Sequence, residues 1–360
     1  MKNKLNKKSE IPDSTKPLRK TRWAFIILIV ILVIIVIFGI LSLGVYLLIR
    51  EIRNRKGDDV DISSTTTTTQ SEEPKKEFGF ITKWGSKGKE EGQFDSPRGI
   101  DFDKDGNVYI ADSQNARIEI FDTNGNFIKS FGSFGPDTGG KFCFPEDIAI
   151  DNEGYIYILD SCLRNVQKLT SDGTFVLKWG EYLMFDKDFD LPAAIEVDNK
   201  GYVYVIDQNA GKVKKFTIEG EFVMAWDGMN APNGPLIFPS GIAIDDKGYI
   251  YVTDTGNSDI KKFNSEGIFT SSFGSYGSGD GQFNIAKGID IDTKGNIYVV
   301  DYGNARFLKF SNTGKFLNVW GSKGSNDGQF GLPLGIGVDK EGNVYISEID
   351  TDRIQKFGLR

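Results

Sequence analysis

The chain has 360 residues, of which 43 are basic, 50 are acidic and none is histidine, which gives a net charge of −7. The lack of histidine excludes a Ser-His-Asp triad, a histidine-ligated catalytic zinc and any imidazole base. The first 77 residues hold 14 basic and 9 acidic residues, which leaves 29 and 41, a net charge of −12, for the rest. Nucleic acid is therefore not expected as a partner, because an acidic surface repels phosphates.

The N-terminal segment predicts a membrane anchor. Residues 23–49 are 27 consecutive residues without a charge, dominated by Ile, Leu and Val, whereas a bilayer core needs only about 20. A buried core helix and a cleaved signal peptide are the alternatives. The length and all-round apolarity of the run disfavour the first, and the lack of a small-residue cleavage site disfavours the second.

The charges around this span predict its orientation. Eight positive charges lie in the basic tail 1–22, and four lie just after the span. The positive-inside rule then places the N-terminus in the cytoplasm and the rest of the chain outside the cell, on a single-pass membrane protein. Residues 50–77, with five consecutive threonines at 65–69, contain too little apolar surface to fold and predict a flexible stalk. The stalk is either a plain linker or an O-glycosylated one.

Six copies of one pattern follow, beginning with GNVYIAD at 106–112 and ending with GNVYISE at 342–348. Their tyrosines are 48, 47, 47, 47 and 47 residues apart, and a fixed period of this length indicates a repeat architecture. Each repeat reads as four short strands joined by tight glycine turns, which is the composition of a propeller blade. The tyrosines are Tyr109, Tyr157, Tyr204, Tyr251, Tyr298 and Tyr345.

The two ends of the repeat region predict how the ring closes. The sixth copy stops before its fourth strand, while residues 80–85 match residues 127–132, which form a fourth strand. Residues 80–84 should therefore complete the last blade, because closure removes two open sheet edges. The predicted fold is all-β: a six-bladed β-propeller of four-stranded antiparallel blades over 78–360, preceded by one transmembrane α-helix.

Three motifs carry a family resemblance: PRGIDFD at 97–103, DSQNARI at 112–118, and the Gly-Gln-Phe runs at 92–94, 281–283 and 328–330. Together they resemble NHL repeats, whose consensus has the form P-x-G-I-A-V-D followed by G-N-I-Y-V-A-D-T-x-N-H-R-I. The resemblance implies a six-bladed propeller and extends to extracellular sensor propellers tethered by one helix, but it implies no reaction. The histidine of the family is replaced here by Ala116, Arg164, Gly211, Ser258, Ala305 and Asp352.

The only two cysteines, Cys143 and Cys162, flank the first two strands of the second repeat. If that hairpin turns about residues 152–154, the two cysteines lie opposite each other, close enough to form a disulfide. A disulfide suits an oxidising exterior. The alternative is a pair of reduced cysteines that fill small spaces.

Acidic residues recur in the repeats. The sets six residues before and three residues after each tyrosine occur in every copy, which favours a structural role in turns. The set eight residues before the tyrosine is acidic only in alternate blades, at Asp101, Glu196 and Asp290. If the first strand of each blade lines the central channel, these three carboxylates converge there, and we expect that they can bind Ca²⁺ or Mg²⁺.

The longer loops all lie on one face of the predicted propeller, where binding usually occurs. Tyr182, Phe185, Tyr276 and Tyr302 are the aromatic residues of this face most suited to contact a ligand. The predicted function is a membrane-anchored, extracytoplasmic propeller that binds a protein, peptide or carbohydrate as a sensor, adhesion or scaffold module. The alternative is a metal-dependent lyase or lactonase that uses the three channel carboxylates.

Overall fold

The computed structural model describes residues 77–136, 138–180 and 188–360. The predicted tail 1–22, the membrane span 23–49 and the stalk up to residue 76 lie outside this range. Within the range, no helix has the length and apolarity needed to cross a bilayer.

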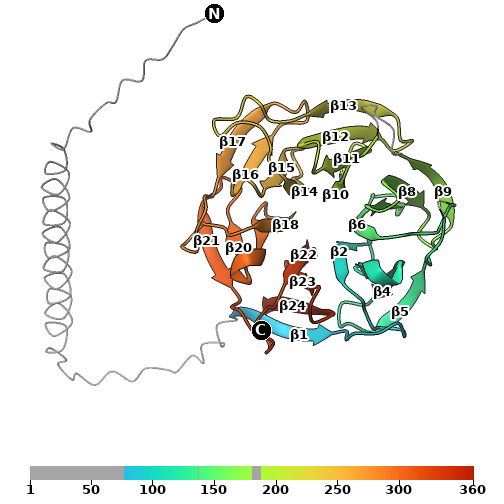
Figure 1. The fold of residues 1–360 in the computed structure, drawn as a ribbon. Coiled ribbons are helices and arrows are strands. Elements are labelled where there is room, and N and C mark those ends of the chain that lie inside the picture. The colour runs from blue at the N-terminus through green and yellow to red at the C-terminus, as the bar shows by residue number, and fades with distance from the viewer. Residues whose placement is uncertain (1–76, 137, 181–187) are drawn as a thin grey trace, which may run out of the picture. The chain divides into compact units, whose positions relative to one another are not determined.

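The described residues form six four-stranded antiparallel sheets around a central axis (Figure 1). In each sheet the first strand is innermost and the fourth lies at the rim. Blade one contains β2 (Pro97–Phe102), β3 (Val108–Asp112), β4 (Arg117–Phe121) and β5 (Phe127–Phe131), and blade two contains β6 (Pro145–Ile150), β7 (Ile156–Asp160), β8 (Asn165–Leu169) and β9 (Phe175–Trp179). Blade three contains β10 (Pro192–Val197), β11 (Tyr202–Asp207), β12 (Lys212–Thr217) and β13 (Phe222–Trp226), and blade four contains β14 (Pro239–Ile244), β15 (Ile250–Asp254), β16 (Asp259–Phe263) and β17 (Phe269–Phe273). Blade five contains β18 (Ala286–Ile291), β19 (Ile297–Asp301), β20 (Arg306–Phe310) and β21 (Phe316–Trp320). Two short 3-10 helices, η1 (Ser113–Asn115) and η2 (Tyr302–Asn304), follow β3 and β19.

The sixth blade is built from both ends of the propeller sequence. It contains β22 (Pro333–Val338), β23 (Val344–Glu348) and β24 (Arg353–Leu359), and its outer strand is β1 (Phe78–Trp84). β1 runs antiparallel to β24, with Phe80 opposite Phe357 and Trp84 opposite Ile354. The first and last strands lie side by side in Figure 1, so the ring is closed and β24 has a partner strand on both sides.

The repeated acidic residues stabilise the turns. In every blade the aspartate six residues before the tyrosine accepts backbone N–H groups of the tight turn and also the tyrosine hydroxyl; Tyr157 Oη, for example, lies 2.8 Å from Asp151 Oδ2. The acid three residues after the tyrosine accepts an N–H of the loop that precedes the blade, as Asp112 does from Asp95 at 2.7 Å. Both sets are structural, because their oxygens saturate backbone donors that would otherwise be unpaired.

The position that holds histidine in NHL repeats has a left-handed backbone in all six blades. The φ values are 52° for Ala116, 55° for Arg164, 61° for Gly211, 57° for Ser258, 52° for Ala305 and 50° for Asp352. This conformation ends the loop between the second and third strands. The residue type varies here because the backbone conformation, rather than one side chain, is what the fold requires.

Phenylalanines from the loops before the blades fill the space between neighbouring sheets. Phe94, Phe142, Phe189, Phe283 and Phe330 are fully buried or nearly so. A Cβ on Gly132 would come within 2.5 Å of the Phe142 ring, and Gly132 also has a φ of 94°. Glycine is therefore required where the fourth strand of a blade ends, and the Gly-Gln-Phe runs serve blade packing rather than ligand contact.

Candidate functional site

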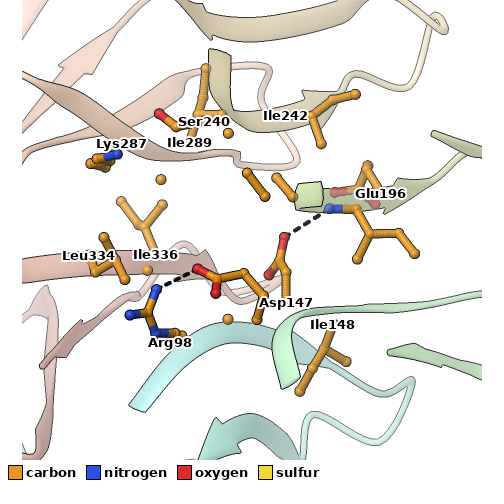
Figure 2. Close-up of a pocket in the computed structure, with 18 of the residues that line it drawn as sticks. Arg98, Asp147, Ile148, Glu196, Ser240, Ile242, Lys287, Ile289, Leu334 and Ile336 are labelled. Atoms are coloured by element: carbon orange, nitrogen blue, oxygen red, sulfur yellow. Dashed lines mark hydrogen bonds and ion pairs between the residues drawn. The ribbon is translucent and has the colours of Figure 1, made fainter. Parts of the chain in front are cut away.

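A cavity of about 300 Å³ lies on the axis of the ring (Figure 2). The innermost strands of all six blades line it, namely β2, β6, β10, β14, β18 and β22. It also reaches Leu191, Ser161 and Gln208, which belong to loops at the end of the axis where these strands begin. We call this end, which carries the loops before each blade and those between second and third strands, the long-loop face.

The fourth residue of each innermost strand gives the cavity an apolar ring. All six positions are isoleucine, and all six are buried. Each belongs to a different apolar cluster, and β-branched side chains suit such buried strand positions. This ring consists of Ile100, Ile148, Ile195, Ile242, Ile289 and Ile336.

The second residue of each innermost strand is where the repeat breaks down. The six positions hold Arg98, Glu146, Ala193, Ser240, Lys287 and Leu334, and all of them line the cavity. No two are alike, although the residues before and after them repeat. A search for recurring features misses these residues; their signal is a strand position whose residue type differs in every blade.

Arg98 projects into the cavity with unused hydrogen-bonding capacity. Its Nη1 forms an ion pair with Glu146 Oε1 at 2.5 Å, and its guanidinium lies 4.7 Å from the centre of the Phe144 ring. Its Nε is buried and has no hydrogen-bond partner among the described residues. A guanidinium has five N–H donors, so Glu146 leaves most of this group free.

Lys287 is the second cation of the cavity. Its ammonium forms no ion pair and no hydrogen bond with any residue of the described ranges. Desolvation lowers its pKa, opposed by the nearby Glu146 carboxylate and reinforced by the like charge of Arg98. Figure 2 shows Lys287 and Arg98 on the same side of the cavity, with Leu334 and Ile336 between them. The wall formed by blades five, six and one is therefore cationic.

The carboxylates predicted to converge do line this one cavity, and a fourth, Asp147, joins them. Asp101 accepts the N–H of Phe102 at 2.7 Å and that of Ile150 in the next blade at 2.6 Å. Asp290 bonds in the same way to Ile291 and to Val338 of the following blade. These acids are bridges between blades.

Asp147 forms a hydrogen bond with the next blade, whereas Glu196 forms one within its own strand. Asp147 accepts the N–H of Ile195 in the next blade at 2.9 Å (Figure 2). Glu196 accepts the N–H of its own neighbour, Val197, at 2.9 Å. Together with Asp101 and Asp290, they place four carboxyl groups around one narrow axis.

Burial within the ring shifts the pKa of all four acids upward. Desolvation raises the pKa of Asp147 and that of Asp290 to about 7, against the lowering effect of their backbone hydrogen bonds. Desolvation also raises the pKa of Asp101 and Glu196 well above the usual range, and repulsion from neighbouring carboxylates adds to it. These groups consequently carry less negative charge at neutral pH than four exposed carboxylates would.

The three acids proposed as metal ligands do not form a metal-binding group. Among the described residues, no set of three or more His, Cys, Asp or Glu side chains is arranged to hold a metal ion. The physical reason is that Asp101 and Asp290 direct both of their oxygens at backbone N–H groups. Ca²⁺ needs about six to eight oxygens at roughly 2.3–2.6 Å, which these occupied carboxylates do not supply.

The aromatic residues proposed for ligand contact are not brought together at this cavity. Tyr182 and Phe185 lie outside the described residues. Tyr276 is 73% exposed on the loop before blade five, and Tyr302 is half-buried in η2. Neither tyrosine lines the cavity.

Exposed apolar residues directly precede three of the innermost strands. Phe238 and Ile285 immediately precede β14 and β18 and are exposed to solvent. Their φ values of 49° and 71° are positive, which is rare for bulky or β-branched residues. Strained positions of this kind gather at binding sites. Leu191, which precedes β10, is also exposed and lines the cavity.

The model of a known family matches residues 88–212 and 236–359 of the chain. That family, DUF5128, is described as a 6-bladed beta-propeller. The chain belongs to this family. No curated protein matches the sequence of this DUF5128 propeller.

Solved structures share the fold of this DUF5128 propeller at low sequence identity. A protein of unknown function from Bacteroides thetaiotaomicron is 17% identical, with a TM-score of 0.63 over 79% of this chain and 76% of that one. A gluconolactonase from Xanthomonas campestris is 16% identical, with a TM-score of 0.57 over 75% of this chain and 88% of that one. Virginiamycin B lyase from Staphylococcus aureus is also 16% identical, with a TM-score of 0.55 over 79% and 100%. At this identity the likeness shows the fold alone.

A disulfide holds one side of the cavity mouth of the DUF5128 propeller together. Cys143 and Cys162 are bonded, with their Cα atoms 5.7 Å apart. Each is adjacent to a residue of the mouth: Phe144 stacks on Arg98, and Ser161 donates to Glu146 Oε2 at 3.2 Å. The bond thus fixes two segments that position the Arg98–Glu146 ion pair.

Replacing both cysteines with serine should lower the free energy of unfolding by about 2–4 kcal/mol, because the unfolded chain loses a cross-link across 19 residues. Urea denaturation with and without dithiothreitol measures this difference. The reductant should destabilise the wild-type protein to the level of the double variant and leave that variant unchanged. Equal midpoints for both proteins without reductant would contradict the prediction.

Proposed function

We propose that this chain is an extracytoplasmic binding protein of the NHL type, tethered to the membrane by residues 23–49, that takes a small ligand in the axial cavity. The observation that carries the proposal is the cavity itself. It combines a cationic wall, a ring of six isoleucines and an unsatisfied donor, Arg98 Nε, in a single site. Pockets with an apolar lining and a few convergent polar groups are typical ligand sites.

Two features support the extracytoplasmic location. The Cys143–Cys162 disulfide suits an oxidising environment and is rare in the cytosol. The uncharged segment 23–49 has the length of a transmembrane helix, and the distribution of positive charges around it favours an external propeller.

The alternative function, a metal-dependent lyase or lactonase, has less support. The fold is shared with a gluconolactonase and a virginiamycin B lyase, but a histidine-to-alanine variant of that lyase is catalytically inactive, and this chain has no histidine. The channel acids are engaged with the backbone. Binding therefore accounts for the described geometry better than catalysis does.

Ala193→Phe tests the cavity as the binding site. Ala193 lines the cavity on blade three, two blades away from Lys287 on blade five, so phenylalanine there should fill the site without removing a charged group. A panel of organic acids, amino acids and monosaccharides is screened by thermal denaturation of residues 77–360. We expect at least one compound to raise the melting temperature of the wild-type protein by a few degrees, since a ligand at 100 times its Kd adds about 2.7 kcal/mol. The variant should show no such rise. A compound that stabilises both proteins equally binds elsewhere and would count against the cavity.

Labelling of intact cells tests the location. In cells that express the full chain, a membrane-impermeant amine reagent should modify exposed lysines of the propeller, such as Lys104 and Lys323. Labelling of these residues only after lysis would overturn the external placement, whatever the cavity binds.

A further inference from the structure

The two cations of the cavity have more binding capacity than the protein uses. Arg98 uses one nitrogen for the ion pair with Glu146, and its buried Nε has no hydrogen-bond partner among the described residues. Lys287 has no acid of its own, although it lies close enough to Arg98 for the two positive charges to affect each other. Two half-buried cations held near each other are costly unless an anion joins them. Glu146 pairs with Arg98 alone, so an anion between the two cations would add a partner for Lys287.

The charge of the mouth indicates what kind of anion fits. Arg98 and Lys287 face one carboxylate, Glu146, which leaves a single positive charge at this wall. A dianion such as phosphate would exceed this charge and would also lie near Asp147 and the deeper acids. A monoanion matches it, and a carboxylate presents two oxygens to the donors of a guanidinium.

The surroundings of the cations indicate the rest of the ligand. Leu334 lies between Lys287 and Arg98 (Figure 2), and the isoleucine ring lies further along the same strands. Phe238, just before β14, is 58% exposed, and both it and Ile285, just before β18, have the strained backbone described above. Such a wall is suited to an apolar chain next to the charged group.

We propose that the cavity binds a small organic carboxylate with an apolar body, whose carboxylate lies between Lys287 and Arg98. This inference rests on the proposed function, since it assigns the ligand class of the same cavity. The carboxylate belongs either to a free organic acid or to the C-terminus of a short apolar peptide, because both present the same group.

Matched pairs of compounds test the proposal on residues 77–360 by isothermal titration calorimetry. Hexanoate and hexanamide represent the free acid, and N-acetyl-L-leucine and N-acetyl-L-leucinamide represent a peptide terminus. Within at least one pair we expect the acid to bind at least tenfold more tightly than its amide, since an ionised hydrogen bond is about twice as strong as a neutral one. The pair with the larger ratio identifies the source of the carboxylate.

Lys287→Met should weaken binding of the acid about tenfold or more and leave binding of the amide unchanged, because it keeps the apolar stem and removes the charge. Lys287→Arg should restore part of the affinity. The matched control is Lys294→Met, an exposed lysine in the turn at the other end of the same blade, which should leave both affinities unchanged.

Equal affinities for acid and amide, an affinity unaffected by Lys287→Met, or tighter binding of inorganic phosphate than of any carboxylate would each overturn the proposal. Failure of all four compounds to bind would overturn it as well. These outcomes are distinct from failure of the proposed function, because another compound of the screening panel can still bind to the wild-type protein and be lost in Ala193→Phe.

Discussion

A chain that begins at Gly85, and so lacks β1, is expected to lose cooperative folding. The deletion removes the outer strand of blade six, whose backbone pairs with β24 from Phe78 to Trp84. It also removes Trp84, which lies against Phe121 of blade one and Tyr345 of its own blade. Burial of one large apolar side chain contributes about 1.5–3 kcal/mol, so the loss of Phe78, Phe80 and Trp84 amounts to several kcal/mol. A typical domain has only about 5–15 kcal/mol in total.

Calorimetry of the two chains measures the effect, with a chain that begins at Glu77 as the reference. We expect one cooperative transition for the longer chain and a broad transition, or aggregation through the exposed edge of β24, for the shorter one. The substitution Trp84→Ala should give an intermediate loss of stability. Superimposable melting curves for the chains that begin at Glu77 and Gly85 would show that β1 does not close the ring.

The stability of the propeller is expected to fall as the pH rises from about 4 to about 7. Asp147 and Asp290 have a pKa of about 7 in the folded protein, against 3.8 for an ordinary aspartate. A group whose pKa is raised on folding favours the folded state at low pH and ceases to do so as the pH passes its folded pKa. Each pKa unit corresponds to about 1.4 kcal/mol, so the two groups together change the free energy of unfolding by several kcal/mol. Asp101 and Glu196 act in the same direction.

Urea denaturation of residues 77–360 at pH 5 and pH 8 measures this dependence. Asp147→Asn keeps an oxygen that accepts the N–H of Ile195 and removes the titration, so it should reduce the difference between the two pH values. Asp105→Asn, in an exposed turn, is the matched control and should preserve that difference. Greater stability at pH 8 than at pH 5 in the wild-type protein would contradict the predicted sign.

The hydrogen bonds of the channel acids, which the prediction of a metal site did not foresee, have a local cause. Three acids on alternate blades do face one axis, as their spacing suggested, but an acid on an innermost strand lies beside the backbone of the next blade. Asp101 and Asp290 therefore accept N–H groups across the junction and are not free to bind an ion. A spacing pattern says which side chains converge, whereas their hydrogen-bond partners depend on how two sheets approach each other.

The sequence by itself determined the architecture. A period of 47 residues, a glycine turn at fixed positions and a spare strand at 80–84 are local or repeated features, and a six-bladed ring follows from them because each blade must cover the apolar faces of its neighbours. The spacing of Cys143 and Cys162 from one hairpin turn likewise located a pair that the structure has bonded.

Only the tertiary structure decided where the candidate site lies. Arg98, Glu146 and Lys287 are 48 and 141 residues apart in sequence, on blades one, two and five, and nothing in any single repeat marks them. They meet because the ring brings the second residue of six innermost strands to one axis, and their unused donors and shifted pKa values arise from that convergence. Contacts of this kind depend on desolvation and charge in three dimensions, and these properties exist only once the ring has closed.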